Sequence, residues 1–387
     1  MPVLPPPRPV RLYDRSFMPA RIGSPLLRAL ASVAPGTALR EGLDRILQAK
    51  MGALIVVGDG QGVLSICSGG FLLDAEYSPQ RLSELAKMDG AIILSADASR
   101  IARANVHLLP DPRVPTVETG TRHRTAERAA RVVNGPVISI SEEMSVITVY
   151  QGEHKQQLAP IGRLIDRASQ ALQTLGGYRT RLDALTGDLS RHEVDDLVTV
   201  RDVVVVLQRC EMVRRIGEEI ASTIVELGSE GRLVQLQLEE LLGGVDRIAT
   251  LVLRDYVAGR SWEDGGRTQL AHLSTEELLE LGLVARVFGL GDARERGERP
   301  DRPDRNDRIE RQLHAHLVPR GYRLLARIPR MADNLVENVA THFASLPLLL
   351  SASIADLTEV EGVGDVRARA IRDGLRRVLE GVATRPR

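Results

Sequence analysis

The segment Lys87-Met88-Asp89-Gly90-Ala91 places one carboxylate directly before an apolar run. Mg²⁺ and Mn²⁺ prefer carboxylate and phosphate oxygens as ligands, so Asp89 could hold such an ion against a phosphate group. Gly90 and Ala91 are small enough to let a ligand approach the backbone closely. An ordinary Asp-Gly turn would explain the same residues, so this segment alone does not decide between the two interpretations.

A second segment, residues 118–128, reads ETGTRHRTAER and is more informative. Gly120 gives a flexible entry to a predicted alanine-rich helix, and the Thr121 hydroxyl can donate to an oxyanion. Free N–H groups in the first turn of a helix, with arginine and histidine beside them, form a phosphate site. The segment therefore predicts phosphate binding, with a solvated, charged helix start as the alternative.

The two arginines of this segment should point to different sides of the turn. We expect Arg122 or Arg124 to contact phosphate, while the other pairs with Glu118 or Glu127.

A third segment near the C-terminus, residues 360–369, reads VEGVGDVRAR. Gly362 and Gly364 permit a tight hairpin whose N–H groups, at the start of the next helix, can bind a DNA phosphate. Arg367 and Arg369 follow, and residues 361–387 contain seven Arg against four Asp or Glu. A turn that only packs two helices is the alternative.

The elements that must position the first two segments are of α/β type. Short β-prone runs alternate with helical patterns between residues 26 and 150, which indicates a sheet covered by helices. The predicted strands are 53–57, 63–67, 90–94, 136–140 and 146–150, the last two joined by a polar turn at 141–145.

Helical periodicity then dominates from residue 156 to about 290 and predicts an all-α middle domain. The β-prone run Val203–Val206 lies within it, but its long helical flanks favour a helix. The charge-dense, proline-broken segment 291–305 is predicted to be a mobile linker. Two similar turn-and-helix units follow, at 328–343 and 360–379, and suggest a tandem helix-hairpin-helix.

Composition sets the broad class. A chain of 387 residues with 43% hydrophobic and 26% charged residues has room for two or three globular domains. The formal net charge is zero, so any basic surface must be local. No apolar stretch approaches the ~20 residues of a membrane span, and the N-terminus has no apolar signal segment. Cys67 and Cys210 fall in different predicted domains, so we expect no disulfide, no membrane partner and a cytoplasmic location.

Asp89 and residues 121–125, with residues 104–108 between them, closely resemble the paired DGA and RHR motifs of diadenylate cyclases. The resemblance covers nearly the whole chain. Residues 69–71, 92–95 and 361–364 also fit the DisA family of DNA integrity scanning proteins, in which a helical linker and a helix-hairpin-helix follow the cyclase. The resemblance implies a cyclase domain at 1–153, a helical linker at 154–310 and a DNA-binding domain at 311–387.

The resemblance also implies roles for residues. Asp89 would bind the metal and activate the attacking 3′-hydroxyl, with Arg122 and His123 as its catalytic partners. The remaining nucleotide contacts would come from Gly90, Ala91, Leu108, Thr121, Arg122, His123, Arg124, Thr125 and, near the adenine, Ser141. DNA contacts would come from Gly362, Gly364, Arg367 and Arg369. The family often has basic residues after that serine, whereas Glu142, Glu143 and Met144 follow here.

The implied reaction condenses two ATP into cyclic di-AMP with Mg²⁺ or Mn²⁺. Because the product is two-fold symmetric, the simplest enzyme places two identical half-sites across a two-fold interface, so a monomer would bind ATP without turnover. The resemblance further implies an octamer, branched DNA junctions as partners, and association with the nucleoid.

Other functions compete with this one. The sequence Lys87-Met88-Asp89-Gly90 also matches the KxDG of ligases that form a lysyl-adenylate, but such ligases need further lysines downstream of this motif, where this domain retains only Lys155. A helix-hairpin-helix DNA glycosylase needs a catalytic Asp well beyond the hairpin, where this chain has only 23 residues after Gly364. A DNA-binding scaffold that merely senses ATP remains open. His314 and His316 lack a second pair of metal ligands, so we expect a surface or linker role.

Overall fold

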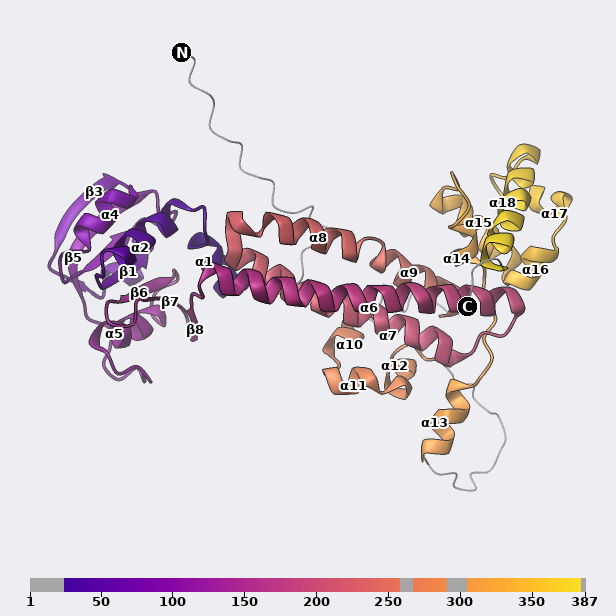
Figure 1. Ribbon diagram of the computed structural model, residues 1–387, viewed down its shortest axis with the longest axis horizontal. Coiled ribbons are helices and arrows are strands. Elements are labelled where there is room, and N and C mark those ends of the chain that lie inside the picture. Colours follow the sequence, from indigo (N-terminus) through magenta and orange to yellow (C-terminus); the bar gives the residue numbers. More distant parts are fainter. Residues whose placement is uncertain (1–23, 258–266, 291–304, 384–387) are drawn as a thin grey trace, which may run out of the picture. The chain divides into compact units, whose positions relative to one another are not determined.

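The computed structural model describes residues 24–257, 267–290 and 305–383. The described residues fall into two compact units, the first within Met1–Leu172 and Glu218–Leu238 and the second within Gln173–Gly217 and Glu239–Arg387. Their boundaries fall within long helices, and each unit is described by itself (Figure 1).

An eight-stranded sheet forms the centre of the first unit, within the described residues. Its order is β2-β5-β4-β1-β6-β7-β8, and β3 also pairs with β5. β1 and β4 are parallel, and the other neighbours are antiparallel. The strands are β1 (Ala53–Val57), β2 (Cys67–Ser68), β3 (Phe71–Glu76), β4 (Ala91–Leu94), β5 (Arg100–Leu108), β6 (Val137–Ser141), β7 (Val146–Gln151) and β8 (His154–Gln157).

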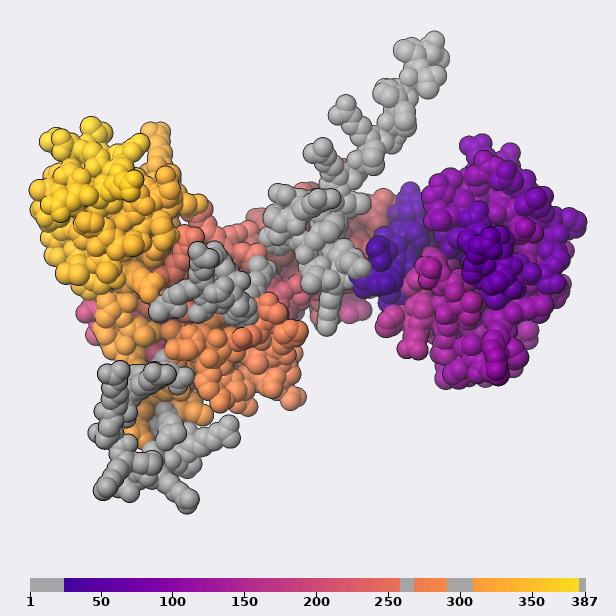
Figure 2. Space-filling model, turned by 180° about the vertical axis from the view of Figure 1, so that it is seen from behind, coloured from indigo at the N-terminus to yellow at the C-terminus, as the bar shows by residue number. Residues whose placement is uncertain are grey.

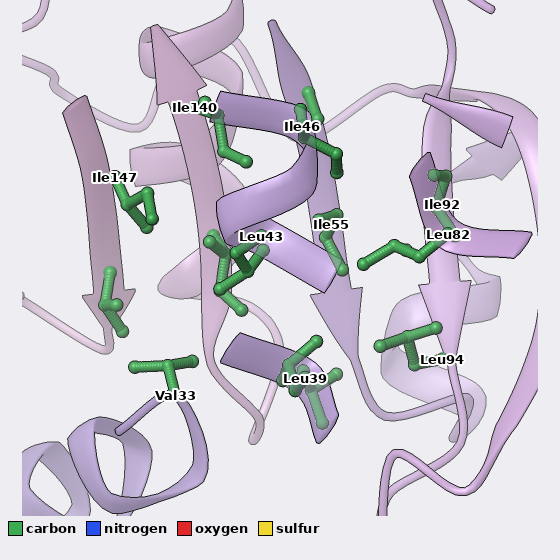
Figure 3. Packing of buried hydrophobic residues seen from close by; sticks show 14 of the residues in the cluster. Val33, Leu39, Leu43, Ile46, Ile55, Leu82, Ile92, Leu94, Ile140 and Ile147 are labelled. Carbon is green, nitrogen blue, oxygen red and sulfur yellow. The ribbon is translucent and has the colours of Figure 1, made fainter. Parts of the chain in front are cut away.

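Helices cover both faces of this sheet, which explains why all five residues of β1 are apolar and buried. On one face, Leu43 and Ile46 of α2 pack with Ile55 and Ile92 in one core (Figure 3). On the other face, the alanines of α5 pack against Val56. The helices are α1 (Pro25–Ser32), α2 (Ala38–Gln48), α3 (Gln61–Leu64), α4 (Pro79–Leu85) and α5 (Thr121–Ala130).

The prediction of a strand at 63–67 is wrong. Residues Gln61–Leu64 form the short helix α3, which begins after Gly60, and only Cys67 enters β2. Val63 is buried in the core between the sheet and α5. An apolar residue that the short helix needs for packing therefore resembled part of a strand.

Three strands escaped prediction, namely β3, β5 and β8. β5 and β8 carry several polar residues, and the apolar start of β3, Phe71-Leu72-Leu73, is only three residues long, so none of them shows the run of four or more apolar residues that marks a buried strand. β8 extends the sheet to Gln157, past the domain end predicted at residue 153, where a helical region had been expected. The remaining strands and the hairpin turn at 141–145 are confirmed.

The middle of the chain is helical, as predicted. Val203–Val206 lies inside α7, and two of these four valines have no exposed surface. The helices are α6 (Ile161–Asp195), α7 (Val200–Leu227), a 3-10 turn at Gly228–Gly231, α8 (Arg232–Leu242), α9 (Val245–Tyr256), α10 (Arg267–His272), α11 (Thr275–Leu279), α12 (Leu281–Val287) and α13 (Arg305–Leu313).

The C-terminal helices share one apolar core and appear as one packed body in Figure 2. They are α14 (Tyr322–Leu325), α15 (Asp333–Phe343), α16 (Leu346–Ser351), α17 (Ile354–Thr358) and α18 (Asp365–Ala383). The predicted duplication is visible in the backbone. Arg330 between α14 and α15 and Gly362 between α17 and α18 both have positive φ, 63° and 85°, two residues after the buried Ile328 and Val360.

A buried ionic cluster joins α14 to the helices α6 and α9 inside the second unit. The Arg323 guanidinium donates to Glu193 at 2.5 Å and to the Thr186 carbonyl at 3.0 Å. Asp255 accepts from the backbone N–H groups of residues 321–323 at 2.7 to 2.9 Å. These contacts tie α14 to the helical domain at a desolvation cost, since Glu193 Oε2 is buried without a hydrogen-bond partner among the described residues and burial raises the pKa of Asp255 to about 7.

Three remaining sequence predictions concern other parts of the chain. Cys67 and Cys210 are free thiols, as expected. Most of the predicted linker 291–305 lies outside the described residues. No helix in the described ranges is both long and apolar enough to cross a membrane.

Candidate active site

One edge of the sheet gathers Asp89 and Ser141. β1 and β4 are parallel with Ile55 opposite Ile92, so the same register places Gly52 opposite Asp89, just before both strands begin. β6 is antiparallel to β1 with Ala53 opposite Ile140, which places Ser141 opposite Gly52 on the other side. Adjacent strands lie about 5 Å apart. Asp89 lies 37 positions after Gly52 and 52 positions before Ser141 in the sequence, yet the three residues meet at this edge.

Asp89 is exposed there, and within the described ranges its carboxylate makes no hydrogen bond or ion pair. A carboxylate in this state can accept an incoming cation. Lys87 is instead paired with Glu84, at 2.7 Å. Ser141 accepts a hydrogen bond from the Met144 N–H at 3.2 Å, which fixes the turn that follows it.

Gly90 and Ala91, the two small residues after Asp89, were predicted to let a ligand approach the backbone, but the structure gives another reason for their small size. A Cβ atom on Gly90 would lie 2.4 Å from the Asn105 Cα atom, so the close approach at Gly90 is made by the backbone of β5. Ala91 and Leu108 are buried in the core with α5. Because β5 runs antiparallel to β4, Leu108 lies toward the same edge as Asp89.

α5 begins at Thr121, where the sequence predicted a helix start. Gly120 is its N-cap and offers no side-chain acceptor to the first turn. The Arg124 N–H bonds back to the Gly120 carbonyl at 2.9 Å, which leaves the N–H groups of Thr121, Arg122 and His123 without a partner inside the helix. Thr125 donates its hydroxyl to the Thr121 carbonyl at 2.9 Å. This helix start has the free donors that an anion requires.

The Arg122 guanidinium lies against Gly52. A Cβ atom on Gly52 would be 2.1 Å from Arg122 Nη1, so only glycine leaves room for this side chain. Because Gly52 is in register with Asp89, the contact brings a cation to the edge that carries the carboxylate. Gly52 is a site residue that the sequence did not reveal, since its role depends on a helix 70 residues away.

The predicted pairing of the arginines with Glu118 or Glu127 is wrong. Glu127 pairs with Arg131 at 3.4 Å and accepts from the Thr116 hydroxyl at 2.5 Å. Arg124 donates to the Thr119 carbonyl at 2.9 Å. Within the described residues Arg122 has no carboxylate partner, so its charge is available to a ligand.

Glu118 belongs to a different network, which reaches His123. It pairs with Lys155 of β8 at 2.5 Å and accepts from the Tyr150 hydroxyl of β7 at 2.9 Å. The same hydroxyl lies 2.9 Å from His123 Nδ1. Tyr150 and Lys155 are opposite each other in the β7/β8 pair, so the ladder itself brings them together. Neither residue was expected in the site, because nothing local marks them.

Burial and the charges of this network shift the pKa values of its titratable groups. Burial alone would raise the pKa of Glu118, but the hydrogen bonds from Lys155 and Tyr150 hold it below its ordinary value. Burial lowers the pKa of His123; Glu118 opposes this effect, and Lys155 and Arg122 add to it. Burial and then Glu118 raise the pKa of Tyr150, so it remains a hydroxyl donor.

The C-terminal hairpin differs in detail from its prediction. Gly362 is the residue whose positive φ the turn requires, whereas Gly364 precedes α18 with open space around its Cα. Arg367 donates to the Gly362 carbonyl at 2.6 Å and so helps to hold the turn. Arg369 and the free N–H groups at the start of α18 are exposed.

No group of three or more His, Cys, Asp or Glu side chains within the described parts of the chain could hold a metal ion. His314 is exposed beside Glu310, and His316 contacts Asp196, at 3.6 and 3.4 Å, as expected for surface residues. Asp89 would therefore need ligand oxygens from a bound phosphate to complete a metal site.

Comparison with known proteins identifies the family. Residues 40–155 match the family described as DisA bacterial checkpoint controller nucleotide-binding, and residues 158–296 match its linker region. The DNA integrity scanning protein DisA of Acidothermus cellulolyticus is 50% identical over 374 residues, which is 95% of this chain and 97% of that protein. The chain belongs to the DisA family. The DisA of Streptomyces coelicolor is 47% identical over 95% of this chain and 97% of its own length.

Among solved structures, DacA from Staphylococcus aureus covers 35% of this chain and 91% of its own, with 24% identity and a TM-score of 0.28. Membership of the DisA family makes this protein a nucleotidyltransferase of the diadenylate cyclase class. The predicted order of an α/β nucleotide-binding domain, a helical linker and C-terminal helices is confirmed. The lysyl-adenylate ligase and the DNA glycosylase are thereby excluded.

Proposed function

We propose that this protein condenses two ATP molecules into cyclic di-AMP and two pyrophosphates. Each 3′-hydroxyl attacks the α-phosphorus of the opposite ATP, loses its proton and displaces pyrophosphate. The observation that best supports this is the common sheet edge on which the free Asp89 carboxylate, the unpaired Arg122 guanidinium and the start of α5 meet. Such transfers depend chiefly on positioning and charge stabilisation.

Asp89 fits a divalent metal site that is completed by substrate. Its exposed, unpartnered carboxylate is the type of ligand Mg²⁺ or Mn²⁺ takes together with phosphate oxygens. The bound ion would neutralise charge on the reacting phosphate. Asp89 would also lie beside the attacking 3′-hydroxyl and favour its deprotonation.

The first turn of α5 would hold the triphosphate. The N–H groups of Thr121 and Arg122, the Arg122 guanidinium and His123 supply donors or charge. Arg124 and Thr125 are partly engaged with backbone carbonyls, so their predicted phosphate contacts require a rearrangement or a shared donor. Ser141, in register with Gly52, would face the adenine, and the backbone beside Gly90, Ala91 and Leu108 would border the nucleotide.

A second subunit would complete the reaction. One chain presents one such edge, whereas the product needs two half-sites face to face, so we propose an even-numbered homo-oligomer, an octamer by family resemblance. Large apolar side chains flank the site in support of this. Val117, next to Glu118, is 86% exposed, and Met144, in the turn after Ser141, is 64% exposed.

A subunit-mixing experiment tests the two-subunit site. Wild-type and Asp89→Asn chains, co-expressed in varied ratios with different tags, should lose activity as the square of the wild-type fraction, since both half-sites of a pair must be intact. Product identity is measured by mass spectrometry, and mixtures with Gly62→Ala chains provide the control, because that Cβ has room beside the Val132 carbonyl, at 3.6 Å. A linear dependence would contradict the face-to-face arrangement.

The C-terminal helices would bind DNA, preferentially branched junctions, and occupancy would restrain the cyclase at the nucleoid. The exposed N–H groups at the start of α18 and the exposed Arg369 support phosphate contacts without base reading. Binding should weaken steeply with salt, and Arg369→Ala should flatten that dependence by about one phosphate contact. If junction DNA never alters ATP condensation by the intact protein, the proposed regulation fails while the cyclase stands.

A further inference from the structure

His123 has one ring nitrogen engaged and one free. Its Nδ1 atom lies 2.9 Å from the Tyr150 hydroxyl, and the two rings meet edge to face. Its Nε2 atom is buried and has no hydrogen-bond partner among the described residues. A buried polar atom without a partner is costly and marks a place where a ligand can contribute.

The direction of each hydrogen in this network follows from the charge on Glu118. An ionised carboxylate only accepts, so Tyr150 must donate its hydroxyl hydrogen to Glu118 at 2.9 Å. The same oxygen can then only accept from His123, which places the imidazole hydrogen on Nδ1. Nε2 of the neutral ring is left with a lone pair.

Titratable groups from the elements around His123 act on its ring. Glu118 precedes α5, Arg122 is its neighbour in α5, Tyr150 belongs to β7 and Lys155 to β8. Burial lowers the pKa of His123; Glu118 raises it in part, while Lys155 and Arg122 lower it further. The ring is therefore neutral in the nucleotide-free protein near pH 7.

A neutral Nε2 cannot donate to a phosphate oxygen, which also presents lone pairs. A proton on Nε2 removes this repulsion, and the triphosphate charge stabilises the imidazolium that results. Glu118 stabilises it from the other side through the shared Tyr150 hydroxyl.

We propose that Tyr150 and Glu118 are positioning residues that hold His123 as its Nδ1–H tautomer, so that Nε2 takes up a proton from water when a triphosphate binds. His123 then donates to the phosphate through Nε2. This inference rests on the proposed triphosphate site at α5. Its pH dependence has a definite sign, because affinity is complete below the pKa of His123 in the free protein and falls as pH rises through the higher pKa of the complex.

The tautomer can be measured without nucleotide or turnover. Full-length protein labelled with ¹⁵N-histidine is sedimented and studied by magic-angle-spinning NMR, and His123→Gln identifies the His123 signal among the eight histidines of the chain. Wild type should show protonated Nδ1 and unprotonated Nε2, and Tyr150→Phe should show a mixture of tautomers. A wild-type signal with the hydrogen on Nε2, or an identical signal in Tyr150→Phe, overturns the inference.

Proton uptake is tested by binding 3′-deoxy-ATP in the presence of Mg²⁺. This nucleotide lacks the attacking 3′-hydroxyl and so cannot react. Calorimetry in two buffers of different ionisation enthalpy should detect proton uptake by wild type at pH 7.5, and Tyr150→Phe should bind about tenfold more weakly with less uptake. Tyr77→Phe is the matched control, since it also loses one hydrogen bond, to the Ala38 carbonyl at 3.0 Å, in the same unit.

The ionisation of the nucleotide is common to all three proteins and cancels in their comparison. Equal proton uptake by wild type and Tyr150→Phe overturns the inference even if both bind. Failure of the proposed function would differ, because wild type would then bind no 3′-deoxy-ATP while the tautomer measurement remained valid.

Discussion

Gly52→Ala should displace Arg122 and weaken nucleotide binding without unfolding the protein. The added Cβ would lie 2.1 Å from Arg122 Nη1 and 2.7 Å from Cζ. To restore a contact of about 3.5 Å, the guanidinium must move by roughly 1.4 Å, which is enough to break a hydrogen bond. The clashing atoms are the free end of a long side chain, and Gly52 does not have positive φ, so the backbone can remain in place.

The magnitude follows from the contact that is lost. A hydrogen bond to a charged group contributes about 1.5–3 kcal/mol, so we expect 3′-deoxy-ATP to bind about 10- to 100-fold more weakly. The free energy of unfolding should change by less than about 1 kcal/mol, because Arg122 has no carboxylate partner in the described protein and Gly→Ala also restricts the unfolded chain.

Calorimetry measures the affinity, urea unfolding measures the stability, and Gly62→Ala is the control. Arg122→Ala should weaken binding at least as much, and adding Gly52→Ala to it should cost nothing more, because both changes remove one contact. The reasoning is refuted if Gly52→Ala binds normally while Arg122→Ala does not, or if the two losses add.

Asp89→Asn should lower the rate of cyclic di-AMP formation at least 100-fold and leave unfolding unchanged, because it removes a metal ligand's charge at constant volume. Arg323→Met should lower the free energy of unfolding by about 3–5 kcal/mol, because Glu193 would be left buried without its cation. Gly362→Val should destabilise the C-terminal helices by more than about 1 kcal/mol through its φ of 85°. Gly364→Val should destabilise these helices less than Gly362→Val does, because Gly364 does not have positive φ, and it should weaken DNA binding by obstructing the phosphate's approach.

Each of these has a measurement that could contradict it. Wild-type turnover in Asp89→Asn would remove Asp89 from the chemistry. Arg376→Met is the control for Arg323→Met, since its ion pair with Asp373 is exposed at 3.5 Å and should contribute less than about 1 kcal/mol. If Gly362→Val lost DNA binding and Gly364→Val kept it, the shape of the hairpin, rather than access to its N–H groups, would govern binding.

Local sequence was sufficient where one segment forms its own structure. The start of α5 at Thr121 followed from Gly120 and the alanines after it, and the hairpin at 141–145 followed from two β-branched runs around a polar turn. Such features depend on backbone propensity and on periodicity over a few residues. The same reasoning failed at Val63, where a single buried valine in a short helix resembled part of a strand.

The sequence by itself determined the kind of chemistry, through Asp89 and the residues from Thr121 to Thr125, and the order of the three regions. Only the tertiary structure decided how these groups are held. The contact of Gly52 with Arg122, that of Gly90 with Asn105, and the chain from Lys155 through Glu118 and Tyr150 to His123 all join distant residues. Strand register and the docking of α5 on the sheet create these contacts, and both depend on which long-range pairings bury the apolar faces together, which no local pattern encodes.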